Sequence, residues 1–459
     1  MQGEYRGDFT RDSFNLEKRF SRVLMQQGRP LLDADWNEQT SILLHYLRTL
    51  TRDLIGDHGG RGDAFQISDK MSNTNRQLKL GPGNYYVDGI LCENAGALDN
   101  GRPGPSEVTL LPDEVKLLDT SPLLVYLDVW ERHLTHIEGD AESEPGIREV
   151  ALGGPDTCSR AQVVWQIRVT AKGPTVQAPA IPTGMKREDA LKIWRDWIHL
   201  LHPPSRGLLR AKAAEPEADD PSKPCILAPK SRYRGAENQL YRVEIHTEGT
   251  AGKATFKWSR ENGSVIFPIK KGYSGGAVIP LAHLGRDARF GLKVGDWVEV
   301  VDDDYTLEHR VEPLLKVEKV DLDAFEITLN AAPQGNTGRR EHPLLRRWDH
   351  AEKNLTGGTS TVQEKNANAD DHWIELEAGV KIQFQPGGYY RSGDYWLIPA
   401  RVATGDVEWP GSPGNPKALP PHGVEHHYAP LAIVPAQGPV IDLRNTFIDL
   451  VTAPQGGKP

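Results

Sequence analysis

The stretch from Asp33 to Gly56 constrains the fold of this chain more than any other segment. Its large side chains recur at spacings of 4, 3, 4, 3 and 4 residues, which is a heptad repeat over nearly three heptads. Such a repeat predicts an α-helix with one apolar seam along its length. The residues of this seam are Trp36, Thr40, Leu43, Leu47, Leu50 and Leu54.

Both ends of this helix carry boundary signals. Asp35 and Glu38 have the spacing of a capping box, with Asp in place of Ser or Thr. Gly56 follows Ile55, and glycine is the residue that most often follows the last turn of a helix. We therefore predict a helix that runs to about Ile55 and is capped by Asp33, Asp35 and Glu38. We expect Arg29 to anchor the segment that leads into the helix.

The apolar band of this helix is wider than the seam alone. Ile42, Leu44 and Tyr46 add apolar surface beside it. A band of this width either packs on this chain's own β-structure or contacts copies of itself, and three heptads are the lower limit for predicting a coiled coil. The sequence leaves both alternatives open.

Charge and hydropathy exclude two classes of partner. The 459 residues include 54 Lys and Arg against 63 Asp and Glu, a net charge of −9, whereas nucleic acids and anionic lipids bind clustered positive charge. The longest apolar run, 123–127, is far shorter than the ~20 residues that span a bilayer. We therefore expect no nucleic acid partner and no membrane insertion.

The N-terminus and the cysteines indicate the compartment of folding. Residues 1–8 are polar and charged, unlike a secretory signal peptide. Cys92, Cys158 and Cys225 are far apart, odd in number and never in a Cys-x-x-Cys spacing, which argues against a disulfide framework and a zinc site. We expect a chain that is synthesised and folded in the cytoplasm.

Before and after the helix, short runs have the composition of β-strands. Residues 20–30 give a short strand signal, and further runs lie at 65–67, 78–80, 85–87, 123–129 and 163–169. Residues 240–246 alternate as a half-solvated strand does, and Asn262-Gly263 is a hairpin signal between runs at 255–260 and 265–267. The predicted fold class is mainly β, with several β-sandwich or barrel-like modules behind an N-terminal arm and amphipathic helix.

Changes of periodicity divide the chain into five parts. Residues 187–201 are an amphipathic helix, and the Pro-, Ala- and charge-rich residues 203–235 form a linker or long surface loop. The expected parts are the arm and docking helix (1–62), a first β-domain (63–175), the helical insertion and linker (176–235), a second β-domain (236–345) and a third β-rich segment (346–459).

No motif of known catalytic chemistry occurs. The sequence has no nucleophile elbow, phosphate-binding loop, dinucleotide fingerprint or zinc-protease motif. His422, His426 and His427 have a spacing that binds metal on a helix, but the prolines around them do not form one. Asp302–Asp304 lacks the alternate-position pattern of a calcium loop and is expected as a solvated hairpin tip. We predict no enzyme, no cofactor and no metal.

The tryptophans are the residues that are compatible with glycan binding or glycan cleavage. Of the 11 tryptophans, those in alternating strands suit a core, whereas Trp396 and Trp409 lie near Gly and Pro turns and are expected to be exposed. Exposed aromatic rings stack on sugars. A glycan-binding or glycan-cleaving protein is therefore the alternative to an assembly protein, and a particle-loaded effector is a third.

Residues 7–12, 22–29 and 32–38 resemble the N-terminal module of an uncharacterised family that is often encoded in phage-tail-like contractile injection loci. The segments 151–157, 256–263 and 295–300 also resemble it, so the resemblance extends over most of the chain. A fainter likeness is to phage baseplate and tail-fibre attachment proteins, in which a strand, a helix and a Gly-x-Tyr hairpin follow one another.

The resemblance implies a structural part of a tail-like particle, in the baseplate, at a fibre attachment or near the cap. It implies other particle proteins as partners and a homo-oligomer, a trimer through the helix. The aromatic residues leave surface glycan open as a further partner. It implies no catalytic residue. The expected assembly interface comprises Arg29, Asp33, Asp35, Trp36, Leu43, Leu47, Leu50 and Leu54.

Overall fold

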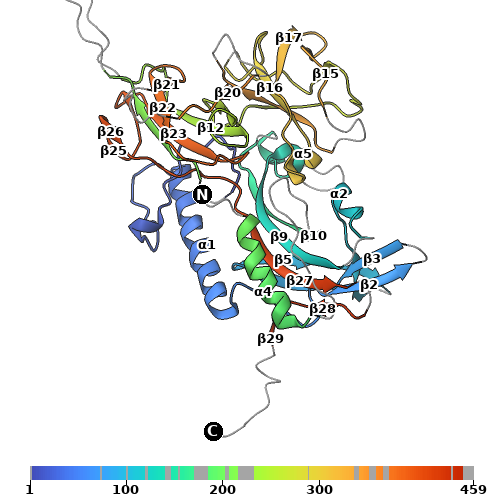
Figure 1. The fold of residues 1–459 in the computed structure, drawn as a ribbon. Coiled ribbons are helices and arrows are strands. Elements are labelled where there is room, and N and C mark those ends of the chain that lie inside the picture. The colour runs from blue at the N-terminus through green and yellow to red at the C-terminus, as the bar shows by residue number, and fades with distance from the viewer. Residues whose placement is uncertain are drawn as a thin grey trace, which may run out of the picture.

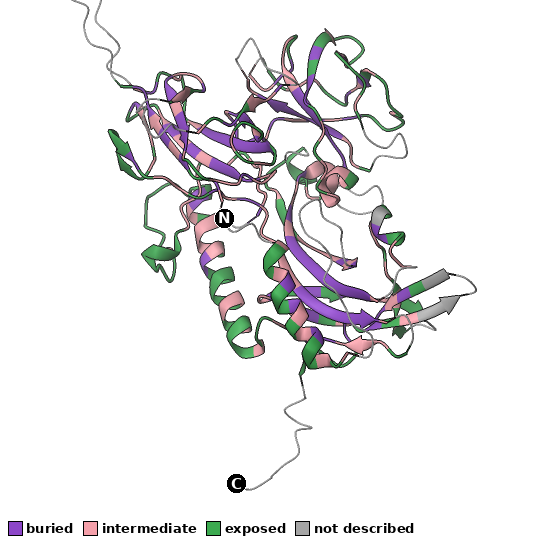
Figure 2. Cartoon of the chain, viewed as in Figure 1, coloured by how far each residue is buried: buried purple, intermediate pink, exposed green. Residues whose placement is uncertain are grey.

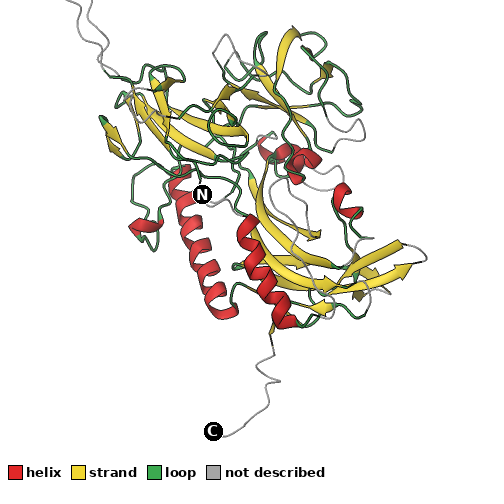
Figure 3. Cartoon of the chain, viewed as in Figure 1, coloured by secondary structure: helices red, strands yellow, loops and turns green. Residues whose placement is uncertain are grey.

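Figure 1 shows the computed structural model of the chain, in which the N-terminus lies where the β-modules meet. The structure describes residues 3–72, 75–99, 102–118, 122–139, 146–153, 156–169, 185–201, 206–215, 232–287, 289–334, 341–350, 358–364, 372–435 and 438–447. Strands dominate and helices are few, as Figure 3 shows, which confirms the predicted mainly β class. The helical elements are η1 (Leu16–Lys18), α1 (Asp33–Ile55), α2 (Pro112–Val115), α3 (His136–Gly139), η2 (Val150–Leu152), α4 (Arg187–Ile198), η3 (His199–Leu201) and α5 (Asp303–Leu307).

One module is built around the long strand β9 (Leu123–Leu134), which pairs with β10 (Arg160–Val169) and with β27 (His427–Val434). The apolar run 123–129 is buried throughout, because this strand is covered on both faces. Leu127 and Val129 face one core, whereas Tyr126 faces α4 and its Trp194. The other strands here are β28 (Ile441–Asp442), β1 (His58–Arg61), β2 (Ile67–Ser72), β3 (Asn75–Leu80), β4 (Gly83–Val87), β5 (Ile90–Asn94), β6 (Ala97–Asp99), β7 (Arg102–Gly104), β8 (Ser106–Glu107) and β29 (Thr446–Phe447).

A second module has a five-stranded sheet whose central strand is β12 (Gln239–Thr247). Its apolar side chains form one core with those of a three-stranded sheet that includes β11 (Leu209–Ala213). β11 lies within the stretch predicted as a linker, and residues 216–231 of that stretch lie outside the described residues. The remaining strands are β13 (Thr255–Ser259), β20 (Ser360–Thr361), β21 (Ile374–Glu375), β22 (Val380–Phe384), β23 (Tyr395–Arg401), β24 (Asp406–Val407), β25 (Gly411–Ser412) and β26 (Asn415–Pro416).

A third module is a six-stranded antiparallel sheet with its own apolar core. Asn262 and Gly263 both have positive φ, 52° and 68°, so the predicted tight turn is present. The predicted hairpin is wrong, because the turn joins two different sheets instead of two paired strands. The strands are β14 (Ile266–Pro268), β15 (Val278–Pro280), β16 (Trp297–Val301), β17 (Leu315–Asp321), β18 (Glu326–Leu329) and β19 (Leu344–Trp348).

The N-terminal segment differs from its prediction at two places. Residues 20–30 form no strand, and Phe20, Leu24 and Met25 are exposed. The helix begins at Asp33, so Asp35 lies inside its first turn and cannot be the cap. Its end is as predicted, since α1 stops at Ile55 and the Gly56 N–H donates to the Arg52 carbonyl oxygen with a φ of 91°.

Gly89, in the turn between β4 and β5, lies close against the backbone of α1. A Cβ atom added there would lie 2.2 Å from the Arg48 carbonyl oxygen, and the φ of Gly89 is +81°. We expect Gly89→Ala to lower the free energy of unfolding by about 3 kcal/mol, because left-handed strain and overlap with α1 add. Urea denaturation measures this. Gly272→Ala, with a φ of +87° and open space around it, should lose only about 1 kcal/mol; equal losses would contradict the close approach.

Candidate functional site

The predicted seam of α1 is exposed along its whole length. The side chains of Trp36, Leu47 and Leu54 are 72%, 60% and 77% exposed, and Leu43 and Leu50 are exposed as well. Figure 2 shows exposed residues along this helix, most of them in its second half. The seam therefore does not pack on the β-structure of this chain, which was one of the two alternatives.

The opposite side of α1 holds the helix on the body. Ala34 and Ile42 are buried, and the Arg48 side chain forms an ion pair of 2.8 Å with Glu131 of β9. At 100° per residue these three positions lie on the side of the helix away from Trp36 and Leu47. The seam consequently points outward from the molecule, and we call it the outward face of α1.

Apolar exposure continues into the loop before the helix. Among the described residues, 13 of the 27 exposed large apolar side chains lie between Leu16 and Leu54. Leu24 and Leu31 are 69% and 78% exposed, and the Val23 N–H donates to Gln39, which holds the loop along α1. Contiguous apolar surface of this kind marks contact sites on proteins more often than chance exposure does.

The predicted capping residues contact the N-terminal arm instead of the helix end. Asp33 accepts hydrogen bonds from the backbone N–H and hydroxyl of Thr10, at 2.8 and 2.5 Å. Glu38 accepts one of 2.6 Å from the Ser13 hydroxyl. The N-cap is Leu32, which supplies no side-chain cap, and the acidic Asp33 and Asp35 in the first turn favour the helix only through its dipole.

Arg29 does not have its predicted role. Its side chain is exposed, and within the described part of the chain its one recorded bond is from its backbone N–H to the Gln26 carbonyl oxygen. Arg29 thus forms a turn in the loop and does not anchor the chain where it enters α1.

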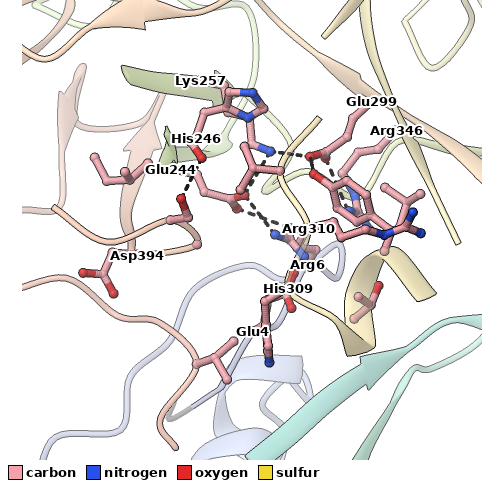
Figure 4. A pocket seen from close by; sticks show the side chains of 18 of the residues that line it. Glu4, Arg6, Glu244, His246, Lys257, Glu299, His309, Arg310, Arg346 and Asp394 are labelled. Atoms are coloured by element: carbon pink, nitrogen blue, oxygen red, sulfur yellow. Dashed lines mark hydrogen bonds and ion pairs between the residues drawn. The ribbon is translucent and has the colours of Figure 1, made fainter. Parts of the chain in front are cut away.

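A second constellation surrounds Arg6, where the arm passes between the β-modules (Figure 4). The Arg6 guanidinium forms a 2.9 Å ion pair with Glu244 of β12. Glu244 also accepts from Arg242 at 2.6 Å and lies 3.3 Å from the Lys257 ammonium. Arg242, Glu244 and Lys257 are buried and the Arg6 side chain is only 11% exposed, so the arm is held by largely buried charge.

Lys257 links this cluster to a second buried carboxylate. Its ammonium lies 2.6 Å from Glu299 of β16, which also accepts from the Tyr305 hydroxyl at 2.7 Å and from the Trp348 indole at 3.1 Å. Burial alone would raise the pKa of Glu299, but the charges of Lys257 and Arg346 lower it to about 2. Glu299 is therefore ionised at neutral pH, and every strong partner that it has is a donor.

The backbone of the arm is clamped as well. The Arg242 guanidinium donates to the Tyr5 carbonyl oxygen at 3.1 Å, and the Asn262 amide donates to that of Gly7 at 2.9 Å. The Tyr395 hydroxyl donates to the Gly3 carbonyl oxygen at 2.9 Å. These three side chains belong to the second module. The first residues of the chain therefore connect the second module to β9 and α1.

A cavity of about 490 Å³ opens beside this cluster, between the three modules. His246 lines it from β12, and burial followed by the charge of Lys257 lowers the pKa of this imidazole to about 4. Asp394 lines it from the loop before β23, is 2% exposed, and has one carboxylate oxygen without a hydrogen-bond partner among the described residues. The nearest cations are Arg391 at 3.5 Å and Arg206 at 3.9 Å.

Asp394 should make stability depend on pH. Burial raises the pKa of this carboxyl to about 7, although Arg206 opposes the change. The folded chain then retains a proton that the unfolded chain loses near pH 4, so stability falls as the pH rises from about 4 to about 7. We expect Asp394→Asn to raise the free energy of unfolding by up to about 4 kcal/mol at about pH 8 and to change it little at about pH 4. Urea denaturation at both pH values tests this, and an equal gain at both would contradict it.

The three histidines considered as metal ligands, His422, His426 and His427, each contact a different residue and do not converge on one point. The Nδ1 atoms of His426 and His427 lie 2.7 Å from Asp128 and 2.9 Å from Asp88, and His422 packs on the Tyr395 ring. Among the described residues no group of three His, Cys, Asp or Glu side chains is placed to hold a metal ion.

Two further expectations are wrong. Asp302–Asp304 is not a solvated hairpin tip, because Asp302 caps α5 and pairs with Arg310 while Asp303 pairs with Arg132. Trp396 is 1% exposed in the core of the second module, and the Trp409 indole donates to the Lys417 carbonyl oxygen. Neither tryptophan is an open platform for sugar.

Comparison with known proteins places this architecture in a family. A model described as "Family of unknown function (DUF6519)" matches residues 5–192 and 200–455, which is nearly the whole chain. The chain belongs to the DUF6519 family. No match to a curated protein was found. In this DUF6519 chain, none of the helices in the described ranges combines the length and apolarity of a bilayer-spanning segment.

Sequence reasoning missed the buried charges of this DUF6519 chain. Residues 240–246 alternate as in a half-solvated strand, yet 240–246 are all buried, including Arg242, Glu244 and His246. The available signal was that β13 and β16 each carry one charge within an apolar run and that β19 carries two, and that these charges have complementary signs: Lys257, Glu299, and Arg346 with Arg347.

Proposed function

We propose that this protein is a structural component of a phage-tail-like contractile injection particle and that it assembles with copies of itself through the outward face of α1. The observation that carries the proposal is the exposed heptad seam, with Trp36 and Leu54 more than 70% exposed. The particle context draws on the resemblance of residues 7–38 and of the later segments. A role by protein–protein assembly requires no catalytic group.

A second copy is the occupant that best suits this face. Heptad spacing presents its residues to another helix of the same spacing, whereas a flat protein surface imposes no such repeat. Leu47 and Leu54 alternate with Leu43 and Leu50 in the two sets of core positions that a coiled coil needs. Since each copy carries the same seam, assembly around a rotation axis buries every seam and closes.

The arm supports the same proposal by fixing the base of the helix. Thr10 and Ser13 bind Asp33 and Glu38 in the first turns of α1, while Arg6 is held by Glu244. The helix therefore stands on a braced N-terminal end. A rigid mount is what a particle component needs if its contacts are to keep one geometry.

Light scattering of the purified full chain tests self-assembly. We expect a mass that is a multiple of 50.9 kDa at micromolar concentration and that falls on dilution. A monomer throughout the micromolar range would overturn assembly through copies of α1.

Purified particles test the wider context. If the genes beside this one encode sheath and tube proteins, the chain should sediment with assembled particles at a fixed ratio to the sheath. A free protein that never co-sediments, or a neighbourhood without sheath and tube genes, would contradict the particle role.

A further inference from the structure

The cavity between the three modules has no part in assembly through α1, and most of the residues that line it have polar side chains. Of the 25 residues that line it, 20 carry a polar side-chain atom. Its volume of about 490 Å³ lies within the range of small-molecule sites.

The charges on the wall are mixed, so they do not select an ion. Six carboxylates and five basic side chains line the cavity. Most are paired with one another: Arg6 with Glu244, Lys257 with Glu299, and Arg310 with Asp302 just behind the wall. A phosphate or other anion would be repelled by the carboxylates, and no dominant cluster of positive charge would compensate. A cation would be repelled by the arginines.

One imidazole is held ready to accept a hydrogen bond in the cavity. The Nδ1 of His426 lies 2.7 Å from the buried Asp128 carboxylate, which holds the proton on that nitrogen. In the neutral ring the Nε2 of His426 then carries the lone pair, and this atom is bonded to none of the described residues. Positioning by a carboxylate is the way in which proteins fix the tautomer of a functional histidine.

A second imidazole completes this part of the wall. The His309 ring lies 4.9 Å from that of His426 and 4.9 Å from that of Trp130, measured between ring centroids. His309 is exposed and has a left-handed backbone with a φ of 52°.

The unsatisfied groups on the other side of the cavity have opposite hydrogen-bonding character. Asp394 has an oxygen without a partner, and the Nε of Arg391 has none among the described residues. A buried carboxylate in this state costs stability, so its presence beside a cavity favours a role in binding. Figure 4 shows Asp394 to one side of the network, and its other carboxylate oxygen lies 3.5 Å from the Arg391 guanidinium.

We infer that this cavity is a saccharide-binding site. A sugar hydroxyl both donates and accepts, so neighbouring hydroxyls can donate to His426 Nε2 and Asp394 and accept from Arg391. A ligand that carries only negative charge or only positive charge cannot form hydrogen bonds with all of these groups. The cavity is separate from the outward face of α1. Saccharide binding and self-assembly are therefore tested by different measurements, and failure of one does not contradict the other.

Titration of the full chain with maltotriose, cellotriose, chitotriose and lactose tests the inference by calorimetry. We expect at least one of them to bind, and Asp394→Asn and His426→Phe to weaken that binding about tenfold or more each, because each removes a hydrogen bond to a charged or oriented group. Asp323→Asn, a change of the same kind at an exposed turn, should leave the affinity unchanged.

Histidine resonances keep the test independent of folding defects in the variants. In wild-type chain with ¹⁵N-labelled histidine, the binding sugar should shift the ring signals of His309 and His426 and leave that of His372, which is exposed and bonded to Gln363, in place. Absence of binding by all four sugars at about 10 mM, or shifts caused by inorganic phosphate or glycine instead, would overturn the inference.

Discussion

Arg6→Ala should lower the free energy of unfolding by about 3 kcal/mol, although Arg6 is only six residues from the start of the chain. Its guanidinium is one of the partners of the buried Glu244 carboxylate, at 2.9 Å. The variant leaves that carboxylate ionised, since Arg242 at 2.6 Å and Lys257 at 3.3 Å remain, but no side chain replaces the lost charge. Urea denaturation followed by tryptophan fluorescence measures the loss.

Arg11→Ala is the matched control. Arg11 also pairs with a glutamate, Glu408 at 3.4 Å, but both side chains are about 40% exposed. An exposed pair contributes little, so we expect a loss of less than about 1 kcal/mol. If the two variants lost the same amount, the arm would not be held by buried charge.

Leu47→Asp should convert the assembled protein to a monomer. Leu47 lies at the centre of the seam and is 60% exposed in the single chain, so aspartate there does not disturb the fold of the monomer. In an assembly the same position is buried, and an unpaired carboxylate in an apolar interface raises the dissociation constant by about a hundredfold or more. Light scattering at several concentrations measures the change in mass.

Leu98→Asp controls for the general effect of the substitution. Leu98 is 80% exposed, lies in β6 and has no place in the seam. This variant should keep the mass and the thermal stability of the wild type. A loss of assembly in both variants would show that aspartate acts through solubility and not through the outward face of α1.

Local features of the fold were predictable because they depend on neighbouring residues. The end of α1 at Ile55, the buried run of β9 and the turn at Asn262-Gly263 each follow from a few adjacent side chains. The N-cap of α1 was predicted three residues too late, at Asp35 instead of Leu32, because the helix has no side-chain cap and Asp33 is bound by Thr10 instead.

Long-range pairing was not predictable from one sequence. β27 pairs with β9 across about 300 residues, and Arg6 binds Glu244 across 238. Neither contact leaves a local periodicity. The exposure of the α1 seam was likewise undecided, since the same heptad pattern suits a helix packed on its own domain. The structure decided it by burying Ala34 and Ile42 on the other side of the helix.

Cross-linking between copies tests the central account most directly. In a chain with Cys158 and Cys225 replaced by serine, Leu50→Cys places a thiol on the outward face of α1, and Ser41→Cys places one on the half-buried side toward the body. The account predicts that mild oxidation links the Leu50→Cys chains into a covalent dimer at micromolar concentration and leaves the Ser41→Cys chains unlinked. Linkage of neither variant, or of both to the same extent, would contradict assembly through the outward face of α1.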